Sequence, residues 1–202
     1  TYIDQKEVKS AFHLFKNDPD ATRDKVLEYF RQMKFYTNSD FAFLDVHNEK
    51  LFYKNSEILI LGSFPSVKSR EQGFYYGHPQ NRFWKVLAAI VQEKIPDFIE
   101  EKKEMLLRNH IAVYDVIWQC KITGSSDSSI KDVVPADITT IVELSKIRKI
   151  YANGKLAEKL FSKYQEKKVG IKAIGLPSTS PANAAYSLER LVEIWSEQIK
   201  QK

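Results

Sequence analysis

The feature that most constrains the fold is an alternation of short apolar segments with longer amphipathic ones, which begins near residue 58. The segment ILIL (58–61) is wholly apolar, as expected for a strand that is buried on both faces of a parallel sheet. Apolar residues then recur at helical spacing in 81–92. Because the alternation continues to the end of the chain, it predicts an α/β domain whose parallel sheet is covered by helices on both faces.

Strands and helices are expected in turn along the rest of this domain. The expected strands are 111–117, 146–153 and 169–176, and the expected helices are 95–110, 136–145, 154–165 and 187–200. Ligands of such folds bind at the carboxyl ends of the strands. Two loops at such ends, 62–81 and 176–186, are chemically rich, so we predict that they form the functional site.

Residues 1–47 differ in character from the rest of the chain. Apolar residues lie at helical spacing between Val26 and Met33, whereas 39–57 is typical of irregular or short extended structure. We therefore expect an N-terminal helical extension of unknown role over 1–47 and a main domain over 48–202.

Composition excludes several classes of protein. Cys120 is the only cysteine, which excludes an internal disulfide and a four-cysteine metal site, and suits a reducing cytoplasm. No apolar run reaches the roughly 18 residues of a membrane span, and the polar start TYIDQKEVKS shows no signal peptide. The net charge of +5 and the pI of about 9.1 fit a phosphate-rich partner and, equally well, ordinary solubility charge.

The loop after ILIL partly matches a phosphate-binding loop, G-x-x-x-x-G-K-[ST]. Gly62, Lys68 and Ser69 fit this pattern, but Val67 stands where the second glycine belongs. A β-branched residue disfavours the positive φ that glycine accepts there. The following segment, 69–81, is rich in turn-forming residues, so no helix is expected to follow the loop at once. A nucleoside triphosphatase is therefore disfavoured.

Four separated segments point instead to one family. They are Gly62–Pro65, Phe74–Trp84, Asp115–Val116 with GSSDSSI (124–130), and Leu176–Ala184. Together they resemble the uracil-DNA glycosylase superfamily, most closely its branch of hypoxanthine-DNA (deoxyinosine) glycosylases. The resemblance spans about residues 50–200 and implies a three-layer α/β/α domain around a four-stranded, mainly parallel sheet. It also implies a monofunctional glycosylase that cuts the N-glycosidic bond of a damaged base in DNA, with no metal or organic cofactor.

An enzyme of this kind must flip the base out of the duplex and hold it. Gly62 and Ser63, at the end of the first strand, are expected on the pocket floor, where glycine lets backbone approach a base closely. By register within the resemblance, Tyr76 is the candidate for stacking on the base. Asn183 is a candidate for its polar edge. Phe64 stands where the wider superfamily commonly has Asp or Asn, and it cannot activate water, so the general base stays unnamed.

Asn81 is the residue expected to carry the chemistry. A neutral amide can orient a water or hydrogen-bond the departing base without a shifted pKa. Asn81 also precedes a helix, so a capping role is the alternative. His78 is a second catalytic candidate, although a His-Pro pair is also typical of a turn. Asp115 lies at a strand end from which a carboxylate can face the pocket or serve as a structural cap.

Contacts with DNA phosphates are expected from basic and hydroxyl side chains around the two loops. The candidates are Lys68, Arg70, Lys155 at the start of a helix, Ser178, Thr179 and Ser180. Asp127 is expected to shape a loop near DNA. No lysine stands beside Asn81, so no Schiff-base lyase step is predicted.

The leading hypothesis is a DNA-repair glycosylase that removes hypoxanthine or a related deaminated base and leaves an abasic site. Two alternatives stay open: a glycosylase for uracil or a mismatched pyrimidine, and a non-catalytic DNA-binding module of the same fold. The expected protein is a cytoplasmic monomer that binds damaged DNA and needs neither membrane nor metal.

Overall fold

A computed structural model of the chain describes residues 42–43, 54–124 and 126–199. The helical extension predicted for 1–47 therefore lies outside the described residues, apart from 42–43. The first two described elements along the chain are the short strand β1 (Ala42–Phe43) and the strand β2 (Ile58–Gly62).

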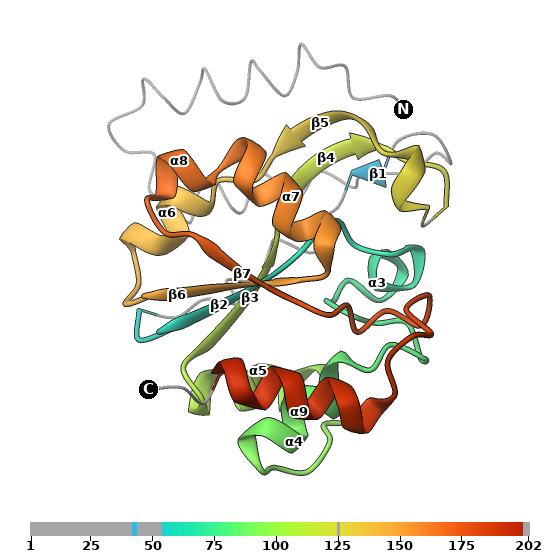
Figure 1. The fold of residues 1–202 in the computed structure, drawn as a ribbon, viewed down its shortest axis with the longest axis vertical. Helices are drawn as coiled ribbons and strands as arrows, with labels where there is room; N and C mark the ends of the chain where they lie inside the picture. Colours follow the sequence, from blue (N-terminus) through green and yellow to red (C-terminus); the bar gives the residue numbers. More distant parts are fainter. Residues whose placement is uncertain (1–41, 44–53, 125, 200–202) are drawn as a thin grey trace. The chain divides into compact units, whose positions relative to one another are not determined.

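A four-stranded parallel sheet forms the centre of the domain (Figure 1). Its order is β3 (Ile111–Asp115), β2, β6 (Lys149–Asn153) and β7 (Ala173–Leu176). In the register of β2 and β3, Gly62 lies opposite Asp115, and at the end of β6 Asn153 lies opposite Leu176. The predicted four-stranded sheet is confirmed, and the register brings all four carboxyl ends to one edge.

Helices cover both faces of this sheet, as predicted (Figure 1). Side chains alternate across the strands, because successive residues of a strand point to opposite faces. Ile60 packs with one set of helices, and Leu59 and Leu61 pack with the other. The first set is α4 (Phe83–Val91), α5 (Ile99–Arg108) and α9 (Leu188–Ile199). The second set is α6 (Ile138–Glu143), α7 (Lys155–Tyr164) and α8 (Glu166–Val169).

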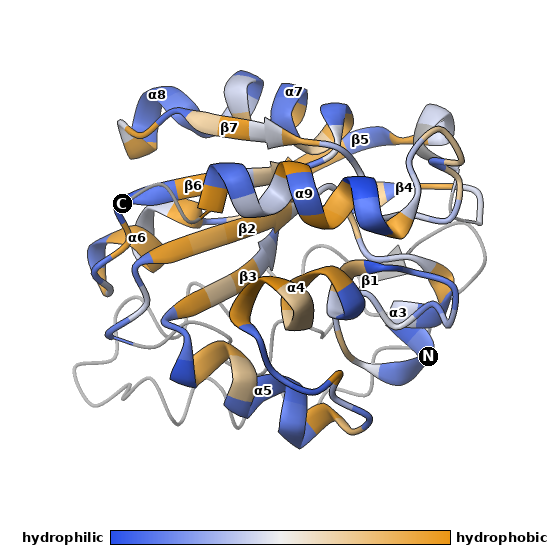
Figure 2. Ribbon diagram, turned by 60° about the horizontal axis from the view of Figure 1, so that its bottom comes forward, coloured by the Kyte–Doolittle hydropathy of each residue, from blue (hydrophilic) through white to orange (hydrophobic). Residues whose placement is uncertain are grey.

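The apolar strands seen in the sequence are the buried ones in the structure. β2 and β3 are hydrophobic along most of their length (Figure 2), and Leu59, Ile60 and Leu61 have no exposed surface. Each of the two helical layers also contributes a fully buried aromatic side chain, Trp195 from α9 and Phe161 from α7. The three-layer α/β/α architecture is therefore confirmed, with one apolar core on each side of the sheet.

A second, antiparallel sheet was not predicted. It consists of β1, β4 (Ile117–Lys121) and β5 (Lys131–Pro135), in the order β1-β4-β5. The single strand predicted at 111–117 breaks at Val116, whose N–H donates to Gly62 O and whose carbonyl accepts from Ala136 N–H. The chain thereby leaves the central sheet. Every residue of β5 is exposed or half-buried, so this strand lacks the apolar pattern that marks a buried strand.

The segment after β2 also differs from its prediction. Val67–Gln72 form a short helix, α3, so the expectation that no helix follows the loop at once was wrong. Ser66 caps its first turn by accepting from the N–H of Ser69, and Gly73 ends it with a φ of 64°. Six residues are too few to show a helical period, so only these two capping residues marked the helix in the sequence.

Candidate active site

A cavity of about 790 Å³ lies at the carboxyl ends of the four parallel strands. Each strand contributes its last residue to the lining: Gly62, Asp115, Asn153 and Leu176. Both of the predicted loops, 62–81 and 176–186, also line it. This is the edge at which open α/β sheets bind their ligands, and the volume falls within the usual range of small-molecule pockets.

Asp115 forms part of the cavity wall with a deeply buried side chain. Only 3 % of the residue is exposed, and this burial raises the pKa of its carboxyl group to about 7. Within the described part of the chain, Oδ2 has no hydrogen-bond partner. The sequence left open whether Asp115 faces the pocket or acts as a cap, and the structure places it at the pocket.

Gly62 makes room for this carboxyl group. A Cβ at position 62 would lie 2.1 Å from Asp115 Oδ1 and 3.2 Å from the Tyr76 hydroxyl oxygen. Any side chain there would therefore displace Asp115. Gly62 was predicted to let a base approach the backbone closely, and in the structure its missing side chain also admits the carboxyl group of the neighbouring strand.

Tyr76 is half-buried, lines the cavity and has a φ of 54°. Its ring stacks on Phe83, with centroids 3.8 Å apart and ring planes inclined by 18°. Its hydroxyl is enclosed and forms no hydrogen bond of good geometry with another described residue. Burial and the charge of Asp115 raise the pKa of this hydroxyl, against a weaker opposing effect of the nearby Asn153 amide. Tyr76 therefore keeps its proton and is a hydrogen-bond donor.

Asn81 is held by two donors. Its Oδ1 accepts from the backbone N–H of Phe83 at 3.0 Å and from the Thr179 hydroxyl at 2.9 Å. The first bond comes from the first N–H of α4, but the N-cap residue of this helix is Arg82, so Asn81 does not hold the N-cap position that the alternative interpretation expected. No described residue accepts a hydrogen bond from Nδ2. Asn81 also lines the cavity, so it offers the cavity a donor and no free acceptor.

A chain of hydrogen bonds sets this orientation. The N–H of Thr179 donates to Asn153 Oδ1, and Asn153 Nδ2 donates to the Thr179 hydroxyl, each at 2.9 Å. The hydroxyl proton is therefore directed to Asn81. Backbone N–H groups can only donate, so those of Phe83 and Thr179 fix which atom of each amide is the oxygen.

Thr179 was predicted to contact DNA, but it has no exposed surface. In this conformation it supports Asn81 from within the protein. Its neighbours Ser178, Ser180 and Asn183 do line the cavity. Asn183 Nδ2 donates to the carbonyl of Ser178 at 2.8 Å, which stabilises the turn of this loop.

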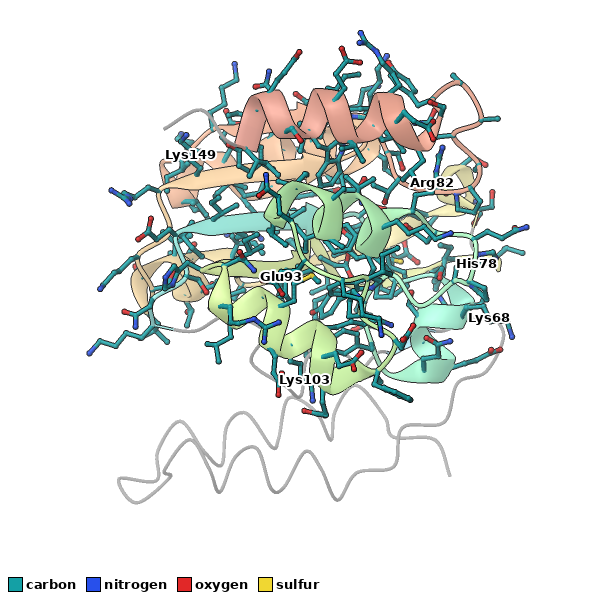
Figure 3. All side chains as sticks on the ribbon, turned by 90° about the horizontal axis from the view of Figure 1, so that it is seen from below. Lys68, His78, Arg82, Glu93, Lys103 and Lys149 are labelled. Atoms are coloured by element: carbon teal, nitrogen blue, oxygen red, sulfur yellow. The ribbon has the colours of Figure 1, made fainter. Side chains whose placement is uncertain are left out.

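Arg82 is a functional candidate that the sequence analysis missed (Figure 3). Its guanidinium group donates to four backbone carbonyls of the loop before α9. They belong to Thr179 (3.4 Å), Ser180 (2.7 Å), Asn183 (2.9 Å) and Tyr186. The arginine therefore ties the segment that carries Asn81 to the second loop. Nothing in the local sequence N-R-F-W distinguishes an arginine that binds backbone carbonyls from one that contacts DNA.

Two of the predicted DNA contacts, Lys68 and Arg70, belong to α3 and have partners inside the protein. Lys68 is half-exposed and forms an ion pair with Glu71 at 2.7 Å. The guanidinium carbon of Arg70 lies 5.8 Å from the centroid of the Phe64 ring, and the group donates to Pro65 O and Gly124 O. Phe64 and Ser63 line the cavity beside them, so Arg70 holds the loop that follows β2.

His78 and Lys155 lie in different surroundings. His78 sits in a turn, where Nδ1 accepts from the N–H of Gln80 at 3.2 Å, and it does not belong to the cavity lining. Lys155 is the first residue of α7 and does line the cavity, directly after Gly154, whose φ is 102°. The structure thus brings Lys155 to the site and leaves His78 outside the cavity wall.

Among the described residues, no group of three or more His, Cys, Asp or Glu side chains is placed to hold a metal ion. None of the helices in that part of the chain has the length and apolarity to cross a membrane.

Comparison with known proteins identifies the class to which this fold and cavity belong. Residues 49–198 match the family model of the uracil DNA glycosylase superfamily, so the chain belongs to that superfamily. A curated relative named "Hypoxanthine DNA glycosylase", from Methanosarcina acetivorans, is 37 % identical over 141 residues, which are 68 % of this chain and 87 % of the relative. A protein of the same name from Methanosarcina barkeri is 32 % identical over 151 residues, 73 % of this chain and 92 % of the relative.

A solved structure shows the same fold. The solution NMR structure of a putative uracil DNA glycosylase from Methanosarcina acetivorans superimposes with a TM-score of 0.63 at 31 % identity. The match covers 74 % of this chain and 94 % of that one. The resemblance inferred from the four sequence segments is therefore confirmed.

Proposed function

We propose that the protein is a DNA glycosylase that hydrolyses the N-glycosidic bond of a deaminated base, with hypoxanthine as the preferred base, and leaves an abasic site. One observation carries this proposal: a polar cavity at the carboxyl ends of the sheet, in a member of the uracil DNA glycosylase superfamily, offers the free amide nitrogen of Asn81. The names of the two curated relatives support hypoxanthine as the base.

The reaction breaks the bond between the sugar C1′ and the base, and the base leaves with the electron pair. The sugar becomes oxocarbenium-like, a water adds to C1′, and the protons are redistributed between the departing base and solvent. Both lone-pair positions of Asn81 Oδ1 are already occupied. Asn81 is therefore a poor acceptor for a water, and its Nδ2 suits the negative charge that develops on the base.

The remaining site residues are proposed as binding groups. Lys155, Ser178 and Ser180 border the cavity and suit the phosphates on either side of the flipped nucleotide. Lys68 and Arg70 contact phosphates of the same DNA strand only if they give up part of their present contacts with Glu71 and the backbone. We propose that the enzyme acts as a monomer and needs no metal.

A substrate panel tests the function. Duplexes that carry one deoxyinosine, deoxyuridine or deoxyxanthosine are incubated with excess enzyme, and abasic sites are detected by alkaline cleavage. We expect the fastest product formation from deoxyinosine. Product from deoxyuridine alone would favour the pyrimidine glycosylase, and DNA binding without product would favour the non-catalytic module.

Two variants of Asn81 separate its roles. Asn81→Asp keeps an oxygen that accepts from the Phe83 N–H and the Thr179 hydroxyl, but it loses the Nδ2 donor. Asn81→Ala loses both. If the donor carries the chemistry, both variants lower the single-turnover rate by about a hundredfold or more. A near-normal rate for Asn81→Asp would show that only the accepting oxygen matters.

A further inference from the structure

Positive charge gathers on one helical layer of the domain. Residues 155–172 form α7, α8 and the segment that leads to β7, and they hold six lysines and two glutamates, a net charge of +4 against +5 for the whole chain. On the other side of the sheet (Figure 1), α5 has equal numbers of acidic and basic residues, and α9 has three glutamates and one arginine. This asymmetry indicates that the α7 side meets an anionic partner.

Three of these lysines form a stripe along α7. Lys155, Lys159 and Lys163 are exposed, whereas Ala157 and Phe161 of the same helix are buried in the core below it. Residues four apart lie on one face of a helix, with a rise of about 6 Å between them. The lysine stripe therefore extends about 12 Å along the helix, and it begins at Lys155, which lines the cavity.

No acidic side chain of the described residues neutralises the lysine stripe. Within that part of the chain, none of the three lysines forms an ion pair. Lys163 Nζ lies 4.8 Å from the centroid of the Tyr164 ring, which carries no charge of its own. Glu158 is the acidic residue of α7, and it turns toward β7: its Oε2 lies 2.5 Å from where a Cβ of Gly175 would be. The three ammonium groups are therefore available to phosphates.

We propose that the lysine stripe binds phosphates of the duplex arm on one side of the damaged base, and that this arm bends over the rim of the cavity to follow α7. The proposal rests on the proposed glycosylase activity, because the flipped nucleotide is what holds the duplex at the cavity. Lysine contacts with phosphates carry no sequence information. The lysine stripe thus contributes affinity and position, and the choice of base stays with the cavity.

The course of α7 explains why the arm must bend. β6 and β7 are parallel, so residues 155–172 return from the carboxyl edge of the sheet toward its amino edge. A straight duplex across the carboxyl edge meets the start of α7 and leaves Lys163 out of reach. Successive phosphates of one strand are about 3.4 Å apart along the axis, so 12 Å of helix spans about three or four of them. The flipped base interrupts stacking, which makes a bend at this point easier.

The dependence of DNA affinity on salt tests the contact. The double variant Lys159→Gln with Lys163→Gln loses two exposed charges and keeps good helix formers. Its affinity for a duplex with one deoxyinosine and about 25 base pairs is measured between about 50 and 200 mM salt. We expect the slope of log affinity against log salt to be smaller by about 1.8 than in the wild type.

A charge-matched control separates this contact from the general field of the protein. Lys54→Gln with Lys94→Gln also removes two exposed charges. Lys54 precedes β2 and Lys94 follows α4, so both lie away from the carboxyl edge. The slope of this control should equal that of the wild type. Circular dichroism verifies that both double variants are folded.

Two measurements on the DNA locate the path of the arm. Methylphosphonate links, which are uncharged, replace single phosphates within about five nucleotides of the lesion on each side in turn. A link at a contacted phosphate should weaken binding by the wild type and weaken binding by the stripe variant much less. Energy transfer between dyes at the two duplex ends reports the bend, and the ends should lie farther apart with the stripe variant than with the wild type.

The outcomes keep this proposal apart from the proposed function. An unchanged slope in the stripe variant, or an equal loss of slope in the control, would overturn the lysine stripe as a DNA contact. Equal end-to-end distances with the two proteins would overturn the bent path. Base release from the deoxyinosine duplex by the wild type is measured alongside: its absence refutes the glycosylase activity, whereas release with unchanged slopes refutes the lysine stripe alone.

Discussion

Replacing Asp115 by asparagine should stabilise the folded protein at neutral pH. The carboxyl group has a pKa of about 7 in the fold and an ordinary value of 3.8. The folded state therefore binds its proton more tightly than the unfolded state does. As the pH rises from about 4 to about 7, the free energy of unfolding of the wild type falls, because ionisation costs more in the fold than in water.

The size of this effect follows from the shift. The difference between 7 and 3.8 is about three pKa units, and each unit is worth 1.36 kcal/mol, so the full effect is about 4 kcal/mol. It is an upper value, since the cavity admits water. Asp115→Asn cannot ionise, so its advantage over the wild type is near zero at pH 4 and grows to as much as about 4 kcal/mol at pH 8.

Urea unfolding of both proteins between pH 4 and pH 8 measures this difference. Subtracting the two curves removes the titration of other groups, such as Glu93, whose pKa is lowered by its hydrogen bond from Arg108. Parallel curves at every pH would refute the reasoning, because the carboxyl group would then be as well solvated in the fold as in water. A less stable variant at pH 8 would show that the carboxylate has a favourable partner.

Three other predictions test the support around the site. Thr179→Val should lower the single-turnover rate about tenfold, through loss of the bond that orients Asn81, while Thr179→Ser restores the rate and DNA affinity stays the same in both. Arg82→Gln should loosen the loop 176–186, lowering the free energy of unfolding by about 1–3 kcal/mol and raising KM more than it lowers kcat; rapid proteolysis of that loop is the direct readout. Lys155→Ala should reduce the slope of log affinity against log salt by about one, and an unchanged slope would remove it from the phosphate contacts.

Much of the fold could be predicted because long buried elements leave a period in the sequence. The apolar run 58–61 and the amphipathic segments after it were enough for the central sheet and its two layers. α3 and the strands β4 and β5 left no such period, because α3 is only six residues long and β5 is largely exposed.

The candidate site, too, could be predicted only in part from the sequence. The two loops could be located because they follow apolar strands, and Asn81 because it lies within a recognisable segment. The approach of Asp115 to Gly62 depends on the register of β2 and β3, which a single sequence does not display. The same is true of Arg82, whose partners are backbone carbonyls about a hundred residues away.

The Thr179 amide also has a use as a spectroscopic probe. Its N–H donates to Asn153, and its hydroxyl holds Asn81, so a single residue joins the end of β6 to the segment before α4. Hydrogen exchange at that amide requires the same local opening that would release Asn81. The exchange rate of one backbone proton therefore reports what fraction of folded molecules holds Asn81 in the orientation proposed for catalysis. Heating or denaturant should diminish this fraction before the sheet itself unfolds.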